Sequence, residues 1–85
     1  MKIKDGYSII PQNDGYIVCY NNTPLEKTIF LSEIPAFLWK LLEEKDLTTA
    51  QMLDAVLNAY EISTVLGLGE IDTFIKLIKE NGIIS

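Results

Sequence analysis

The chain has 85 residues, of which 48% are hydrophobic, and a formal net charge of −5. This length and apolar content predict a single folded domain over residues 1–85. The apolar content is too high for a disordered tail. All seven basic residues are lysines, so the sequence has no basic stripe and none of the guanidinium groups typical of nucleic-acid-binding proteins. We therefore expect no nucleic-acid partner.

Targeting features are also lacking in the sequence. No apolar run approaches the roughly 18 residues needed to cross a bilayer, so we expect no membrane partner. The first ten residues have neither the apolar stretch nor the cleavage site of a secretion signal. The single cysteine, Cys19, excludes an internal disulfide and suits a reducing compartment. We expect a cytoplasmic protein.

The first third of the chain predicts three short strands. The first is Tyr7–Ile10, and the second is the β-branched and aromatic run Tyr16–Tyr20. Between them, Asp14-Gly15 is a hairpin signal, because glycine adopts positive φ without steric cost. A turn over NNTPLE then leads to the third strand, Lys27–Leu31. Side chains in this strand should alternate between the two faces of the sheet.

Three helices follow. Ser32 is a suitable N-cap for the first, whose apolar stripe has Trp39 beside it. The second opens with the capping box Thr48-x-x-Gln51. The glycines of EISTVLGLG predict a connection, so the last helix is expected from Glu70 to Asn81. Gly82 then has the position of a left-handed C-cap, with Ile83 folding back on the final turn. Strands followed by helices indicate an α+β domain.

Catalytic and metal-binding residues are scarce. The sequence has no histidine, which removes the commonest general base and metal ligand. Cys19 lies on a predicted strand without a base, and is interpreted as a buried thiol. The cluster of Glu43, Glu44 and Asp46 at a helix end is interpreted as a solvated face rather than a cation site. We therefore expect no enzyme, no metal site and no cofactor.

Two features point beyond a bare scaffold. Leu77 lies about 100° around the last helix from the centre of its inward stripe, so the helix has a wide apolar shoulder. The third predicted strand, Lys27–Leu31, lies at a sheet edge and offers unpaired N–H and C=O groups to another chain. Edge and shoulder together suit an extended peptide as well as they suit plain packing.

Three segments together resemble the PqqD-like family. FLSEIPAFLWKLL resembles its first helical segment, with Leu31, Ala36 and Trp39 in place. LTTAQMLDAVLNAYEIS is similar to the second helix, and EIDTFIKLIKENGII to the closing helix. Departures are Ser32 where asparagine is usual, Pro35, and a glycine-rich lead that predicts a late start of the last helix. The resemblance covers essentially the whole chain.

The resemblance implies a winged-helix-like fold, with a three-stranded antiparallel sheet followed by three helices. It implies a RiPP recognition element, a non-catalytic peptide chaperone that binds the leader segment of a ribosomal precursor peptide by strand addition. The chaperone presents the precursor to a modifying enzyme, often a radical SAM enzyme, and some members of the family form homodimers. Carried onto this sequence, the peptide-binding residues are Lys27, Thr28, Ile29, Phe30, Leu31, Glu70, Thr73, Phe74, Lys76, Leu77 and Ile78. Lys76 and Lys79 would attract an acidic leader.

Two alternatives stay open at the level of sequence. A winged-helix fold also suits a nucleic-acid-binding or regulatory domain, although the net charge of −5 opposes this interpretation. An enzyme is the other alternative, and no residues in the sequence support it.

Overall fold

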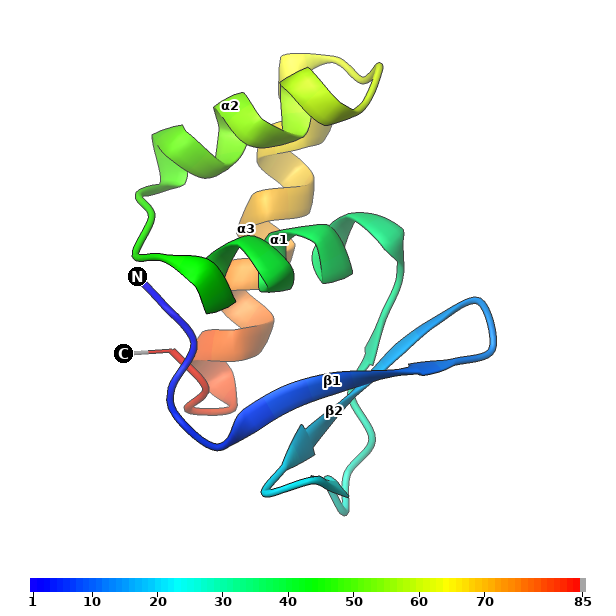
Figure 1. Cartoon of the computed structure of the whole chain (residues 1–85). Helices are drawn as coiled ribbons and strands as arrows, with labels where there is room; N and C mark the ends of the chain where they lie inside the picture. The colour runs from blue at the N-terminus through cyan, green and yellow to red at the C-terminus, as the bar shows by residue number, and fades with distance from the viewer. Residues whose placement is uncertain (85) are drawn as a thin grey trace.

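Strands occupy the first part of the chain and helices the rest in the computed structural model, which describes residues 1–84 (Figure 1). The predicted α+β fold, an antiparallel sheet followed by three helices within these residues, is confirmed. In chain order the elements are β1 (Tyr7–Gln12), β2 (Gly15–Tyr20), β3 (Thr23–Pro24), β4 (Phe30–Leu31), α1 (Glu33–Glu44), α2 (Thr49–Ala59) and α3 (Thr64–Glu80).

The hairpin of β1 and β2 is confirmed, but its glycine has a different role from the predicted one. The strands pair from Tyr7–Tyr20 to Gln12–Gly15, so β1 runs two residues beyond Ile10. The residue with positive φ in the connecting turn is Asn13, at 56°. Gly15 lies in β2, where a Cβ would overlap the Phe30 ring. Gly15 therefore permits the close approach of β4 rather than the turn.

The third predicted strand, Lys27–Leu31, is wrong in its extent. Asn21 and Asn22 both have positive φ, at 51° and 65°, and form a tight turn that pairs the chain with β2 at once, in β3. The pairing is then interrupted: the Val18 carbonyl accepts from the Leu25 N–H at 3.3 Å, while the Val18 N–H donates to the Ile29 carbonyl at 3.1 Å.

The three residues between these two bonds, Glu26, Lys27 and Thr28, leave the ladder as a bulge. Only Phe30–Leu31 of the predicted strand forms β4. The turn at Asn21 and Asn22 therefore makes the third segment pair with β2 earlier in the chain than strand propensity indicated. The bulge divides this pairing into β3 and β4.

The first two helices begin at the predicted N-cap residues. Ser32 is the N-cap residue of α1, but its side chain makes no capping hydrogen bond. The capping box of α2 is complete: the Thr48 Oγ1 accepts from the Gln51 N–H, and the Gln51 Oε1 accepts from the Thr48 N–H. The second predicted start is therefore confirmed together with its mechanism.

The predicted start of the last helix at Glu70 is wrong, because α3 begins at Thr64. Ser63 caps it by accepting from the Leu66 N–H at 3.2 Å. Gly67 is buried in the helix, and a Cβ there would lie 3.1 Å from Leu53 Cδ1 of α2. The glycine that was interpreted as a helix breaker therefore allows two helices to approach closely.

The end of α3 is as predicted. Gly82 has φ of 67°, its N–H donates to the Lys79 carbonyl, and the Ile83 N–H donates to the Ile78 carbonyl at 2.8 Å. This is the Schellman pattern, and the Ile83 side chain is fully buried. The Ile83 carbonyl then accepts from the Lys4 N–H at 2.8 Å, which ties the two ends of the chain together (Figure 1).

One hydrophobic core joins the sheet to the helices. Its largest fully buried side chains include Trp39 and Phe74, and the indole Nε1 of Trp39 donates to Glu43 Oε2 at 3.0 Å. Cys19 is buried in β2, as predicted. Within residues 1–84, no helix combines the length and the apolar character that crossing a membrane requires.

Candidate functional site

An open sheet edge lies along β4. In the register of β4 with β2, Ile29 and Leu31 direct their main-chain groups toward β2, and Phe30 alternates with them. The N–H and C=O of Phe30 therefore point away from β2. Among residues 1–84, no strand pairs with this outer side of β4. A donor and an acceptor are available there to another strand.

The β3 part of the same edge is poorer in donors. In its register, Thr23 pairs with Tyr20 and Pro24 lies opposite Cys19. Pro24 is the outward-facing residue of this pair and has no N–H to donate. The bulge over residues 26–28 separates this part from β4. Strand addition is thus favoured beside Phe30 rather than along the whole third segment.

A ridge of α3 contains the shoulder predicted from the sequence. Leu66, Glu70, Thr73 and Leu77 follow each other at spacings of four and three residues, so they share one face of the helix. Leu66 and Thr73 are exposed, whereas Glu70 and Leu77 are half-buried. We call these four residues the α3 ridge. It presents both apolar and polar groups at the surface.

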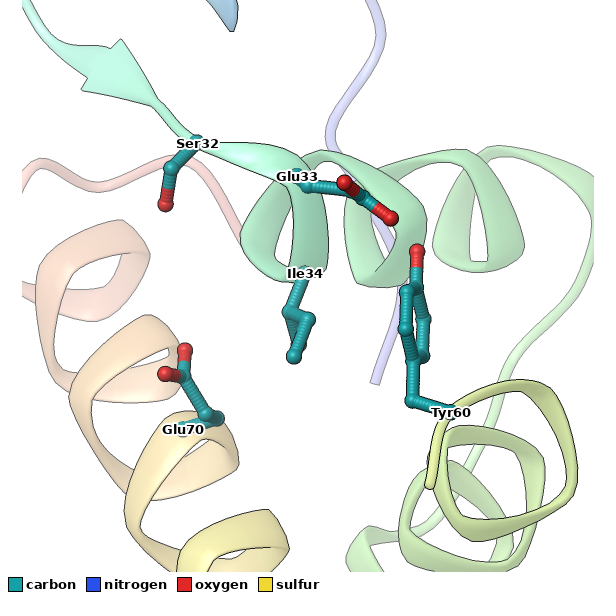
Figure 2. Close-up of a pocket in the computed structure, with 5 residues that line it drawn as sticks. All are labelled: Ser32, Glu33, Ile34, Tyr60 and Glu70. Carbon is teal, nitrogen blue, oxygen red and sulfur yellow. The ribbon is translucent and has the colours of Figure 1, made fainter. Parts of the chain in front are cut away.

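A cavity of about 290 Å³ joins the end of β4 to the α3 ridge (Figure 2). Ser32, the residue after β4, lies on one side, and Glu70 points toward the cavity from α3. The lining residues are Ser32, Glu33, Ile34, Tyr60 and Glu70. We call this space the inner cavity. It places the open edge and the ridge beside one hollow, as a peptide-binding surface requires.

Tyr60, at the end of α2, forms a wall of the inner cavity. Its hydroxyl points toward the Glu33 carboxylate (Figure 2). Burial of the ring raises the pKa of Tyr60 above its ordinary value of 10.0, and the neighbouring negative charge of Glu33 raises it further, with a partial opposing effect from Lys40. The Tyr60 hydroxyl therefore stays protonated at neutral pH and donates hydrogen bonds.

A second hollow lies on the outer side of the ridge. Its lining residues are Val65, Leu66, Gly69, Glu70 and Thr73. Val65 is 80% exposed and Leu66 61% exposed, so the first turns of α3 carry apolar side chains into solvent. Glu70 borders both hollows.

The predicted site residues separate into three groups. Phe30, Glu70, Thr73, Lys76 and Leu77 reach the surface, with Phe30 half exposed at 50%. A second group has its side chains in the core, so these side chains are not available to a partner. Its members are Ile29, Leu31, Phe74 and Ile78. Lys27 and Thr28 are exposed in the bulge and lie outside the ladder.

Sequence reasoning missed four residues of the inner cavity. Ser32 was predicted only as a helix N-cap, and Glu33, Ile34 and Tyr60 were not among the predicted site residues. The spacing of these residues in the sequence does not indicate a shared site. The cavity forms only where the start of α1, the end of α2 and the middle of α3 come together in the fold.

The acidic residues at the end of α1 are engaged elsewhere. Glu43 accepts the hydrogen bond from Trp39, and Asp46 pairs with the amino group of Met1. Glu43, Glu44 and Asp46 are all exposed, which agrees with their interpretation as a solvated face.

A comparison with solved structures finds one of the same fold. The chain is similar to TbiB1 in complex with the TbiA(beta) leader peptide, with a TM-score of 0.75 and 19% sequence identity. The likeness covers 100% of this chain and 95% of that chain. The comparison with protein-family models gives no match, and neither does the comparison with curated proteins. The fold implied by the PqqD-like resemblance is confirmed.

Proposed function

We propose that the chain is a non-catalytic peptide chaperone, which binds the leader segment of a ribosomal precursor peptide. The leader adds as a strand to the outer side of β4 and lies against the α3 ridge. The observation that carries this proposal is the open donor and acceptor of Phe30 beside the inner cavity. Support also comes from the fold shared with TbiB1, a protein solved with a leader peptide bound.

The energetics require more than main-chain pairing. Each typical hydrogen bond contributes only about 1 kcal/mol net, and β4 is two residues long. Selection must therefore come from side chains of the leader on the ridge, where Leu66 and Leu77 provide apolar contacts. Lys76 is exposed near this ridge and would speed the encounter with acidic segments in a salt-dependent way.

The chaperone role implies a second partner, the modifying enzyme. The PqqD-like resemblance favours a radical SAM enzyme in this position. The chain itself would supply no reacting group, because its function is to hold the leader while the enzyme acts on the rest of the precursor. A homodimer formed through β4 would compete with the leader for the same edge, so peptide affinity should be measured at several protein concentrations.

Replacement of Phe30 by proline tests strand addition. Proline removes the outward N–H of residue 30 but leaves the bonds between β4 and β2 intact. The matched control is Phe30→Ala, which loses the ring and keeps the N–H. With the leader of a precursor encoded beside the gene, Phe30→Pro should bind at least about fivefold more weakly than Phe30→Ala, from a donor worth about 1 kcal/mol.

Amide chemical shifts of the labelled protein provide the second readout. Leader binding should shift Phe30, Ser32 and the α3 ridge in the wild-type protein. Equal affinities of the two folded variants, or shifts confined to α2, would rule out strand addition at β4.

A further inference from the structure

The inner cavity continues the path of a strand added to β4. Ser32 follows β4 directly, and its side chain faces the gap toward α3 (Figure 2). In a peptide strand paired with Phe30, the residue next to the paired one therefore directs its side chain toward this gap. At about 290 Å³, the cavity lies just below the range of roughly 300–1,000 Å³ for drug-sized ligands, so one long side chain is a suitable occupant.

The lining of the inner cavity combines apolar and acidic groups. Ile34 and the ring of Tyr60 provide apolar surface, while Glu33 and Glu70 bring two carboxylates from opposite sides (Figure 2). No lysine is among the lining residues. A side chain with an aliphatic stem and a cationic end matches both parts of this lining.

The chain does not neutralise these carboxylates itself. Within residues 1–84, the ion pair that forms joins Met1 and Asp46, so neither Glu33 nor Glu70 has a cationic partner there. Lys40 is near enough to affect Tyr60, but its ammonium donates to the Tyr16 hydroxyl at 2.8 Å and lies 4.5 Å from the centre of that ring. The negative charge of the cavity is thus open to a partner.

We infer that the inner cavity receives a lysine or arginine side chain of the bound peptide, next to the segment that pairs with β4. This inference rests on the proposed function and assigns a chemical requirement to one position of the peptide. The stem lies on Ile34 and the Tyr60 ring, and the cationic group lies between Glu33 and Glu70. The basic residue enters at this end, whereas Lys76, farther along α3, favours acidic residues of the peptide.

Selection from a phage-displayed library of random peptides tests the requirement without knowledge of the natural precursor. Peptides enriched on the wild-type protein should have lysine or arginine at one fixed position. The double variant Glu33→Gln/Glu70→Gln should lose this preference. The control Asp72→Asn/Glu80→Gln removes the same charge from exposed positions of α3 outside the cavity, and should keep the preference.

A selected peptide then gives the size of the effect. Its analogue with norleucine in place of the basic residue should bind about twofold to thirtyfold more weakly to the wild-type protein, as expected for two solvent-accessible charge pairs. The Glu33→Gln/Glu70→Gln variant should bind peptide and analogue equally. The difference should shrink at high salt, because such pairs are screened.

The outcomes separate this inference from the proposed function. Two results would overturn the cavity assignment and leave strand addition intact. In the first, the enriched peptides depend on the Phe30 N–H but have no preferred lysine or arginine. In the second, the preference for lysine or arginine is unchanged in Glu33→Gln/Glu70→Gln. A failure to enrich any peptide that distinguishes Phe30→Pro from Phe30→Ala overturns both.

Discussion

The two halves of α3 differ in what they contribute to the molecule. The half from Phe74 to Glu80 places Phe74 and Ile78 in the core, each at most 1% exposed, and ends in the Schellman turn. The half from Thr64 to Thr73 begins with Val65 and Leu66 in solvent and includes two glycines. One helix thus anchors the fold at its C-terminal end and presents a surface at its N-terminal end.

Packing against α2 explains how the N-terminal half stays folded with so few large buried side chains. Because Gly67 has no side chain, Leu53 and Leu57 of α2 pack close to the α3 backbone. A Cβ at position 67 would lie 3.1 Å from Leu53 Cδ1 and 3.4 Å from Leu57 Cδ2. Ile71 is buried one turn later. The surface of this half that is not packed on Leu53 and Leu57 borders the inner cavity and the second hollow.

The largest expected effect contrasts one residue from each half. Phe74→Ala should lower the free energy of unfolding by about 3–5 kcal/mol, because it removes a fully buried ring and leaves a cavity. Leu66→Ala should change it by less than about 0.5 kcal/mol, since that side chain is mostly in solvent. Urea denaturation measures both. If Leu66→Ala lowered the free energy of unfolding as much as Phe74→Ala, the two halves of α3 would not differ in their contribution to stability.

Glycine substitutions should give intermediate effects of opposite sign. Gly82→Ala should cost about 1–2 kcal/mol, because φ of 67° is strained for alanine. Gly69→Ala should add about 0.5–1 kcal/mol, because a Cβ there meets nothing within 4 Å in a helical position. Thermal unfolding of both variants, with Gly67→Ala as the crowded comparison, checks these signs. Destabilisation by Gly69→Ala would show that its surroundings are not open.

The smallest expected effect concerns pH at the wall of the inner cavity. Because the pKa of Tyr60 is raised above 10.0 in the folded protein, its contribution to stability is complete below pH 10.0 and is lost as the pH rises through the folded-state pKa. Between pH 10.0 and the folded-state pKa, the free energy of unfolding should fall less steeply in Tyr60→Phe than in the wild type. Glu33→Gln should reduce the difference. Identical slopes in all three proteins would argue against burial of Tyr60 beside Glu33.

Local signals with one physical mechanism were predicted well from the sequence. The capping box at Thr48 and the C-cap at Gly82 each depend on residues a few positions apart, and both are confirmed. The buried position of Cys19 also followed from its chemistry and its place on a predicted strand. The extent of the third strand did not, because two left-handed asparagines and a bulge decided where pairing with β2 occurs.

Site residues were predictable only where they share one element. Glu70, Thr73 and Leu77 lie on one helical face, which spacing alone indicates. Phe74 and Ile78 were also included in the proposed site, although their side chains are in the core. Spacing already places Phe74 and Ile78 on the inward stripe of the helix. They were included because the groove implied by the PqqD-like resemblance was carried onto the whole segment from Glu70 to Ile78.

The amino-acid sequence by itself determined the order of strands and helices, the capping box of α2, the C-cap of α3 and the apolar stripes, because these depend on neighbours within a few residues. Tertiary structure decided that Gly67 is a contact and not a break, that α3 begins at Thr64, and that Glu33, Tyr60 and Glu70 surround one cavity. Those outcomes depend on the distance between elements far apart in the chain, which packing sets and local sequence does not encode.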